Sequence, residues 1–250
     1  MSKVCIAIPC YNEGVFIVKT VLVVDEFMKG LNIDYEIVVA DDASSDDTEE
    51  KGMYLASNYN HIRYVSNDFT SPHMNGKGVA VSRAWLSSDA DVFMFIDADL
   101  AIDLRIVKEA LFYLGEGWDV VVGSKHLPQS DVVYPKLRRV LSKCYSILSK
   151  NLLGSNVRDH QCGFKAFKSG VALSLIPFVE SSGWSWDVEI LIKAQWVGFR
   201  VLEVPARVKD VYDRGSSFNV FGGTWTMGVY LFKILLGKRD FLRKWKKLSV

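Results

Sequence analysis

The chain has 250 residues, of which 49% are hydrophobic, and a formal net charge of +1. A chain of this size and composition buries a full core, and no linker divides it into two independent domains. Its four cysteines show neither CxxC spacing nor a disulfide-dense pattern, and the apolar run that ends at Pro9 is too short for a secretory signal. We therefore expect a reducing cytoplasm rather than export.

Short apolar runs alternate with helical patterns through the first half of the chain. Strands are expected at residues 4–8, 35–40, 62–66, 92–96 and 120–123, and helices at 15–29, 46–57, 77–87 and 103–114. The later part is less regular, with a helix expected at 135–153, a strand at 164–167, a helix at 186–196 and a strand at 200–204. The alternation predicts an α/β protein with a doubly wound, mostly parallel sheet.

Two carboxylates follow the strand expected at 92–96. Asp97 and Asp99 stand one residue apart, where a hard divalent cation is the natural compensation for their charge. Such a pair also serves to cap a following helix, so by itself it leaves both interpretations open. Three further segments are expected to reach the same sheet edge, where α/β sheets bind ligands: residues 8–13, 41–42 and 76–78.

In their order and spacing these motifs resemble family-2 glycosyltransferases of the GT-A fold, and among them the polyprenyl-phosphate (dolichol-phosphate) mannose and glucose synthases. The resemblance runs from Val4 to about Phe218. It includes Ile-Pro-Cys-Tyr-Asn-Glu at 8–13, Asp-Asp at 41–42, Gly-Lys-Gly at 76–78, Asp-Ala-Asp at 97–99 and Asp-His-Gln-Cys-Gly-Phe-Lys at 159–165. It implies a catalytic GT-A domain over residues 1–219, followed by a C-terminal segment at 220–250.

The resemblance also implies that a nucleoside-diphosphate sugar binds at this sheet edge. The donor-binding residues would be Pro9, Tyr11, Glu13, Asp41, Lys77, Asp97, Ala98, Asp99 and Arg214. Asp41 would accept hydrogen bonds from the base or the ribose. Helix capping by Asn12 and a dipole contribution from Glu13 can hold at the same time, and Lys77 fits a phosphate contact and a solvated loop charge equally well.

Strand alternation would point Asp97 and Asp99 in similar directions, so that both bind one Mg²⁺ or Mn²⁺ ion together with the donor diphosphate. The ion would neutralise charge on the leaving group, which makes these two aspartates the expected catalytic pair. Two positions depart from the family pattern, because Ala101 stands where many relatives have Gln and Phe218 stands where Lys is expected. Arg214 is then the best candidate for the loop contact to the diphosphate.

Within the helix expected at 135–153, Arg138 and Ser142 are four residues apart and share a face. The resemblance implies that they hold the phosphate of a polyprenyl-phosphate acceptor, helped by Lys125, whereas an ordinary basic surface helix is the alternative. A phosphate monoester is already anionic, with a second pKa near ~6, so inverting displacement needs no general base. We expect Asp187 and Glu189 to order the acceptor loop rather than to act as a base.

The C-terminal segment is apolar first and basic afterwards. Residues 220–236 are mostly apolar, and residues 233–250 hold seven basic side chains against Asp240 alone, which leaves −5 for the rest of the chain. The apolar run is shorter than the ~20 residues of a spanning helix. It predicts an amphipathic interfacial helix on an anionic membrane surface, with a core-packed helix or an oligomer contact as the alternative.

These patterns predict a metal-dependent inverting glycosyltransferase, peripheral at the cytoplasmic face of a membrane, that moves a hexose to polyprenyl or dolichyl phosphate. GDP-mannose is favoured as the donor, and UDP-glucose or a soluble or polysaccharide acceptor are alternatives. From another class, a non-catalytic sugar-nucleotide-binding module at the membrane also fits. No nucleic-acid-binding motif accompanies the basic end, and no GxGxxG follows the first strand, which excludes a dinucleotide-binding oxidoreductase.

Overall fold

The computed structural model describes residues 2–67, 75–133, 136–183, 185–209 and 220–248, and within these the side chains of 136–142 and 220–227 lie outside the description. Seven strands form one sheet in the order β3-β2-β1-β4-β7-β5-β8. Their bounds are β1 (Val4–Cys10), β2 (Tyr35–Asp41), β3 (Ile62–Ser66), β4 (Val92–Ile96), β5 (Val120–Ser124), β7 (Phe164–Lys168) and β8 (Val201–Pro205). All pairs are parallel except those of β7, which runs antiparallel to both β4 and β5.

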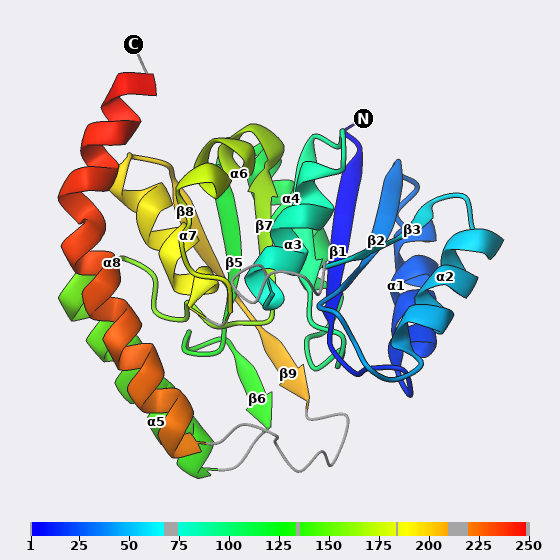
Figure 1. Ribbon diagram of the computed structural model, residues 1–250, viewed down its shortest axis with the longest axis horizontal. Coiled ribbons are helices and arrows are strands. Elements are labelled where there is room, and N and C mark those ends of the chain that lie inside the picture. The colour runs from blue at the N-terminus through cyan, green and yellow to red at the C-terminus, as the bar shows by residue number, and fades with distance from the viewer. Residues whose placement is uncertain (1, 68–74, 134–135, 184, 210–219, 249–250) are drawn as a thin grey trace.

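The helices lie between and after these strands (Figure 1). They are α1 (Ile17–Lys29), α2 (Thr48–Asn58), α3 (Lys77–Leu86), α4 (Ile106–Gly115), α5 (Lys136–Leu153), α6 (Ser169–Leu175), the 3₁₀ turn η1 (Ile176–Phe178), α7 (Trp186–Trp196) and α8 (Val220–Leu248). A right-handed crossover through a helix is the usual way to join neighbouring parallel strands, and the first three strands follow that plan.

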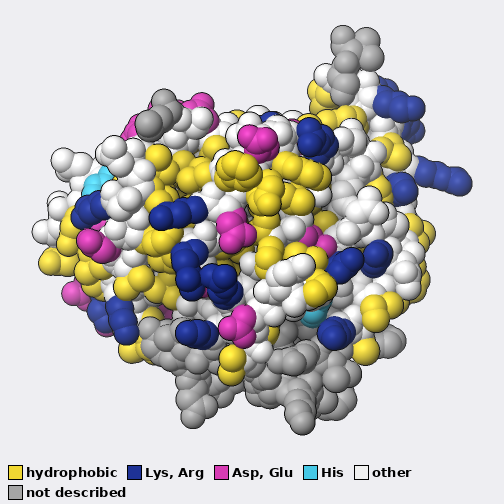
Figure 2. Space-filling model, turned by 180° about the vertical axis from the view of Figure 1, so that it is seen from behind, with side chains coloured by type: hydrophobic (Ala, Val, Ile, Leu, Met, Phe, Trp, Pro, Cys, Tyr) yellow, Lys and Arg dark blue, Asp and Glu magenta, His cyan; other side chains and the backbone are white. Residues whose placement is uncertain are grey.

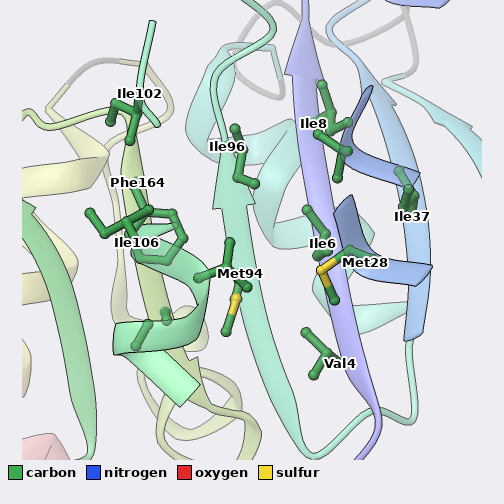
Figure 3. Packing of buried hydrophobic residues seen from close by; sticks show 14 of the residues in the cluster. Val4, Ile6, Ile8, Met28, Ile37, Met94, Ile96, Ile102, Ile106 and Phe164 are labelled. Atoms are coloured by element: carbon green, nitrogen blue, oxygen red, sulfur yellow. The ribbon is translucent and has the colours of Figure 1, made fainter. Parts of the chain in front are cut away.

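Alternating side chains of β1 supply both faces of the sheet. Val4, Ile6 and Ile8 join the core beneath α1, α2 and α4 (Figure 3). Cys5 and Ala7 face the opposite core, which α3, α6 and α7 cover and which centres on Trp85. Both faces are covered, so the central strands β1 and β4 consist of buried apolar residues throughout, as strands covered on both faces do.

Most predicted elements are present, and the predicted α/β class with a mostly parallel sheet is confirmed. The strand expected at 4–8 continues to Cys10, and the helix expected at 103–114 begins later, at Ile106. Three features are not predicted by the sequence pattern: α6, η1 and a second sheet in which β6 (Asp131–Val133) pairs in parallel with β9 (Arg207–Lys209). In Figure 1 this small sheet lies beneath the large one.

Helix α8 lies beside α5 along the edge of the molecule beyond β8 (Figure 1). Leu231 and Ile234 of α8 pack with Leu153 of α5 and with α7, and Phe241 reaches the core around Trp85. One side of the helix is therefore packed on the core, as the alternative interpretation of the C-terminal segment expected. In the described part of the chain, none of the helices combines the length and the apolar character that crossing a membrane requires.

Candidate active site

The loops that follow β1, β2 and β4 meet at the carboxyl edge of the sheet. The parallel register places Cys10 beside Asp41 and Asp41 beside Ser66, so β1, β2 and β3 end level with one another. Ala7 lies beside Phe95, so β4, which ends at Ile96, stops slightly before the end of β1. Each of the three loops holds a non-glycine residue at positive φ: Asn12 at 54°, Ala43 at 58° and Leu100 at 49°. Backbone strain of this kind concentrates at functional sites, because the surrounding structure must enforce it.

Asn12 joins the first two of these loops. Its backbone N–H donates to Ser44 Oγ at 2.9 Å, and its side-chain Oδ1 accepts from the Ser45 N–H at 2.8 Å. Helix α1 begins only at Ile17, with Phe16 at its N-cap. The alternative role of Asn12 as a helix cap is therefore wrong, because the chain makes a further turn before α1 starts.

Asp41 is fully committed to contacts within the protein. Its Oδ1 accepts from the Ser44 hydroxyl at 2.5 Å and from the Ser44 N–H at 3.1 Å, and its Oδ2 accepts from the Tyr64 hydroxyl at 2.7 Å. The residue is only 1% exposed. A contact between this carboxylate and a donor base or ribose stays a prediction. It requires a carboxylate oxygen of Asp41 to accept a hydrogen bond from the donor in addition to the one from Ser44 or Tyr64.

The other donor residues of the β1 and β4 loops differ in exposure. Tyr11 is exposed, Glu13 is half-buried, and Pro9 lies buried within β1. Ala98 is buried, and its carbonyl accepts a hydrogen bond from Thr20 Oγ1 of α1 at 2.7 Å. Of this group, Tyr11 presents the side-chain surface on which a planar ring can pack, and the donor-binding role of all four stays a prediction.

Asp42 fixes the start of helix α3. Its Oδ1 accepts from the Asn67 side-chain amide at 2.7 Å and from the Gly76 N–H at 2.5 Å. Gly76 has a φ of 126°, and a Cβ there would clash with the Ser182 carbonyl, so glycine is required at this position. The same Ser182 carbonyl accepts from the Gly78 N–H at 2.8 Å. Hydrogen bonds from the Gly76 N–H and the Gly78 N–H thus fix the backbone on both sides of Lys77. They fix the position from which the Lys77 side chain extends.

Asp97 and Asp99 lie in a turn and not on a strand. Strand β4 ends at Ile96, and the Leu100 N–H donates to the Asp97 carbonyl at 3.1 Å, which closes the turn. Asp99 Oδ1 accepts from the Ala101 N–H at 3.0 Å. The prediction that strand alternation orients both carboxylates is therefore wrong, because the alternating geometry of β4 ends at Ile96, before Asp97. The turn, with Leu100 in the left-handed region, now sets the directions of the two carboxylates.

Lys77 connects the turn that holds Asp97 and Asp99, called the aspartate turn below, to helix α7. Its Nζ lies 2.7 Å from Oδ1 of Asp97 and 3.7 Å from Oδ2 of Asp187, and 4.5 Å from the centroid of the Phe95 ring. The Asp97 side chain is 32% exposed, and that of Lys77 is 15% exposed. Lys77 is thus an ion-paired residue of the site, and the interpretation as a solvated loop charge is wrong.

The pKa shifts follow from these contacts. Burial alone would lower the pKa of Lys77, but the carboxylates of Asp187 and Asp97 outweigh it and raise that pKa. Burial alone would raise the pKa of Asp97, but the Lys77 ammonium holds it below its usual range. Both groups are therefore charged near neutral pH, and the Asp97 carboxylate already has a cation against it.

A second ion pair lies deeper in the protein and was missed by the sequence analysis. Lys165 Nζ on β7 lies 2.7 Å from Oδ1 of Asp187, and the two side chains are 0% and 2% exposed. Lys165 also donates to the Cys162 carbonyl at 3.1 Å. The sequence does indicate a buried lysine here, because Lys165 interrupts the apolar run Phe164-Lys165-Ala166-Phe167, and the other three residues of this run are buried. A lysine inside such a strand needs a buried partner.

Glu189 orders the loop before α7, and the predicted role of this loop in binding the acceptor stays a prediction. Its two carboxylate oxygens accept from the backbone N–H groups of Glu180 at 3.1 Å and Ser181 at 2.8 Å. Lys193 pairs with the same carboxylate at 2.5 Å. Because the next residue of that loop, Ser182, holds the Gly-Lys-Gly run, Glu189 indirectly supports the position of Lys77.

Gly163 gives the Asp97 carboxylate its space. The Gly163 carbonyl accepts from the Asp97 N–H at 3.1 Å, and a Cβ on Gly163 would clash with Oδ2 of Asp97. Phe164, the next residue, pairs with Ile96 across the antiparallel β4–β7 ladder. The run 159–165 thus meets the aspartate turn because β7 is inserted next to β4.

Lys125, expected at the acceptor phosphate, is held by the same run. Its Nζ lies 3.4 Å from Asp159 Oδ2 and donates to the Gln161 carbonyl at 3.1 Å. Burial alone would raise the pKa of Asp159, but Lys125 keeps it below the usual range. Arg138 and Ser142 lie on α5, with side chains outside the description, and Arg214 and Phe218 lie outside the described residues. Their roles stay predictions.

The arrangement defines an α/β protein whose candidate ligand site lies at the carboxyl ends of its strands, where lysines pair with carboxylates. The chain belongs to glycosyl transferase family 2, because the model of that family, described as "Glycosyl transferase family 2", matches residues 5–174. This finding confirms the family resemblance on which the sequence analysis relied.

Relatives with similar sequences carry related names. The chain is 37% identical to Glycosyltransferase AglD of Haloferax volcanii over 99% of this chain and 38% of that protein. It is 29% identical to Dolichyl-phosphate beta-glucosyltransferase of Dictyostelium discoideum, over 96% of this chain and 76% of the relative. Dolichol-phosphate mannosyltransferase of Pyrococcus furiosus is 31% identical over 81% of this chain and 55% of the relative. The chain thus spans well under two thirds of the first and third relatives.

The fold is similar to that of glucosyl-3-phosphoglycerate synthase from Mycobacterium tuberculosis, solved in complex with Mn²⁺, uridine diphosphate and glucosyl-3-phosphoglycerate. The TM-score is 0.67 at 23% identity, over 95% of this chain and 80% of that chain. At this identity the likeness shows the fold, and it agrees with the GT-A architecture expected from the motifs.

Proposed function

We propose that this protein transfers one hexose from a nucleoside-diphosphate sugar to a polyprenyl phosphate. The observation that carries the proposal is the partly exposed Asp97 carboxylate at the carboxyl edge of the sheet, with a cation already 2.7 Å from it. Relatives named dolichyl-phosphate glucosyltransferase and dolichol-phosphate mannosyltransferase support the class of acceptor. The motifs favour mannose from GDP-mannose, with glucose from UDP-glucose as the alternative, and the two names support either sugar.

The residues of the site fit a divalent cation. Carboxylate oxygens are the ligands that Mg²⁺ and Mn²⁺ prefer, the Asp97 side chain is 32% exposed, and the Lys77 ammonium is a stand-in cation at its Oδ1. Asp97 and Asp99 would hold the ion, which when bound neutralises charge on the leaving diphosphate. Within the described part of the chain, His, Cys, Asp and Glu side chains form no cluster of three or more suited to a metal. Donor oxygens and water would complete the coordination.

The protein's own contribution to the reaction is positioning and charge. Lys77, on the first turn of α3, presents its ammonium to the region where the donor diphosphate would lie. Lys125, Arg138 and Ser142 would hold the acceptor phosphate, which is ionised near neutral pH and attacks the anomeric carbon without a general base. Attack from the side opposite the leaving group would invert that centre. Lys125 serves this role if the acceptor phosphate replaces the Gln161 carbonyl among its contacts.

A lipid acceptor requires the site to lie near a membrane surface. The described part of α8 exposes Val229, Phe232 and Leu236, and Ile147 and Leu148 are exposed on the neighbouring α5. Lys and Arg side chains stand out along the projecting end of α8 (Figure 2). We propose that this edge lies on the anionic, cytoplasmic surface of a membrane as a peripheral contact, because apolar and basic side chains together favour that interface.

The test is transfer of radiolabel from GDP-mannose and, in parallel, UDP-glucose into an organic-extractable product, with purified protein, a polyprenyl phosphate, and Mn²⁺ or EDTA. We expect transfer from one donor, loss of transfer with EDTA, and a loss of at least a hundredfold in Asp97→Asn. Asp89→Asn is the matched control, because Asp89 also pairs with a lysine, Lys3, at 2.5 Å, but away from this edge.

The outcomes separate the alternatives. Product that stays in the aqueous phase would replace the lipid acceptor with a soluble one. Donor binding that survives in the wild type without any transfer would favour a non-catalytic sugar-nucleotide-binding module. Equal transfer by wild type and Asp97→Asn would remove the proposed role of the aspartate turn.

A further inference from the structure

The charged groups around Lys77 form a continuous chain of alternating sign. Asp97, Lys77, Asp187 and Lys165 follow one another, with Lys77 on one side of Asp187 and Lys165 on the other. The exposed fraction of the side chain falls along this series of charged groups, from 32% at Asp97 to 0% at Lys165. The exposed end faces the site, and the buried end is anchored in strand β7.

Lys77 stands unequally between its two carboxylates. Its Nζ is 2.7 Å from Oδ1 of Asp97 but 3.7 Å from Oδ2 of Asp187. Lys165 approaches the other oxygen of Asp187, Oδ1, at 2.7 Å. Both ammonium groups lie near the face of the Phe95 ring, at 4.5 Å and 4.9 Å from its centroid, which favours cations on this path.

We propose that Lys77 is the resident counter-ion of Asp97 and that it moves to Asp187 when a divalent cation binds Asp97. Asp187 is then a positioning residue, held ready by Lys165. The inference rests on the proposed role of Asp97 as a metal ligand. It goes further, because it assigns a function to three residues, Lys77, Asp187 and Lys165, in the free protein.

The exchange follows from electrostatics. A divalent cation and an ammonium group repel one another at the same carboxylate, so the cation competes with Lys77 for Asp97. A displaced ammonium that stayed mostly buried without a partner would be strongly disfavoured. Asp187 removes that obstacle, since a shift of about one ångström in a flexible lysine side chain suffices to reach it. Lys165, 2.7 Å from Oδ1 of Asp187, holds this carboxylate in place.

The test measures free Mn²⁺ by electron paramagnetic resonance in titrations of nucleotide-free protein. We expect Lys77→Met to bind Mn²⁺ about tenfold more tightly than the wild type, because the competing ammonium is gone. Lys29→Met is the matched control, because Lys29 also pairs with an aspartate, Asp25, at 2.7 Å, but near the end of α1. It should leave Mn²⁺ affinity unchanged.

A second variant separates the exchange from general electrostatics. Asp187→Asn combined with Lys165→Met removes one negative and one positive charge, so the net charge is unchanged and no buried charge is left unpaired. With Lys77 present we expect Mn²⁺ affinity to fall about tenfold, because the displaced Lys77 ammonium no longer finds the Asp187 carboxylate. In the Lys77→Met background the same double change should have no effect, as a double-mutant cycle requires for direct coupling.

The readouts distinguish the failure of this inference from that of the proposed function. Wild-type protein that binds no Mn²⁺, or Asp97→Asn that binds as well as the wild type, would overturn the metal site and this inference together. Mn²⁺ binding that depends on Asp97, with no gain in Lys77→Met or with additive effects in the cycle, would overturn the exchange alone. Circular dichroism of each variant checks that it folds. If the variant that lacks the buried Asp187–Lys165 pair does not fold, the Lys77→Met titration still tests whether Lys77 competes with Mn²⁺ for Asp97.

Discussion

At the scale of single residues, the site depends on how closely other groups approach Asp97. Its carboxylate has Lys77 on one oxygen and the Cα of Gly163 beside the other. The motifs predicted both aspartates and Lys77 in one site, and the structure brings Lys77 and Asp97 into contact. They did not reveal Lys165, because a single lysine in a strand does not disclose which buried carboxylate it meets.

Gly163→Ala tests the need for space beside Asp97. The added Cβ would clash with Oδ2 of Asp97, so we expect the carboxylate to shift and transfer activity to fall by one to two orders of magnitude. Activity assays and thermal melting of the variant are compared with those of Gly170→Ala, where a Cβ meets nothing within 4 Å. Unchanged activity in Gly163→Ala would show that the position of this carboxylate is not critical.

At the scale of elements, a neutral histidine joins helix α5 to the loop that carries Asp159 and Gly163. His160 Nδ1 lies 3.2 Å from Ser149 Oγ of α5, and its Nε2 lies 2.9 Å from Ser155 Oγ. Ser155 in turn accepts from the Gln195 amide of α7 at 3.1 Å. The helix expected to hold the acceptor phosphate is thus tied to the site by uncharged hydrogen bonds.

Burial lowers the pKa of His160 to about 4, whereas it is near ~6.5 in the unfolded chain. The unfolded state therefore binds the extra proton between these values, so the contribution to stability is full above pH 6.5 and is lost as pH falls toward 4. Between pH 7 and pH 5 we expect the wild type to lose about 2 kcal/mol more than His160→Gln. Urea unfolding of both proteins at the two pH values measures this difference, and parallel losses would contradict it.

The elements themselves were predictable to different degrees. The predicted bounds of β3, β4 and α7 match the observed ones, and β4 is an unbroken run of buried apolar residues, which is typical of a central strand. The strands β6 and β9 have three residues each and exist through pairing with one another, so no local pattern predicts them. The antiparallel direction of β7 likewise depends on the long connection through α5 and not on its own sequence.

At the scale of the whole molecule, α5 and α8 form an edge with exposed apolar and basic side chains. Phe232 and Leu236 of α8 are 55% and 82% exposed, while Leu231 and Ile234 are buried against the core. The helix is thus compatible with core packing and with a membrane contact, since one side packs on the protein and another exposes apolar side chains to solvent. Its amphipathic contact with a membrane stays a prediction.

Vesicle sedimentation tests that contact. We expect the wild-type protein to bind vesicles that contain phosphatidylserine, more weakly at high salt, because headgroup attraction is screened. Phe232→Glu with Leu236→Glu should weaken binding at least tenfold without loss of stability, since both side chains are exposed. Phe112→Glu, an exposed aromatic of α4, is the control. Equal binding by the α8 variant would place the membrane contact elsewhere.

The sequence by itself determined the α/β class, the order of most elements and the family, because apolar periodicity and the spacing of short motifs are local properties of the chain. It also named Asp97, Asp99 and Lys77. Only the tertiary structure decided that β7 lies antiparallel between β4 and β5, and that insertion carries Gly163 and Lys165 to the site. The reason is physical: which charges meet inside a protein depends on strand order and burial, and residues 88 positions apart, such as Lys77 and Lys165, share a carboxylate only after the sheet has formed.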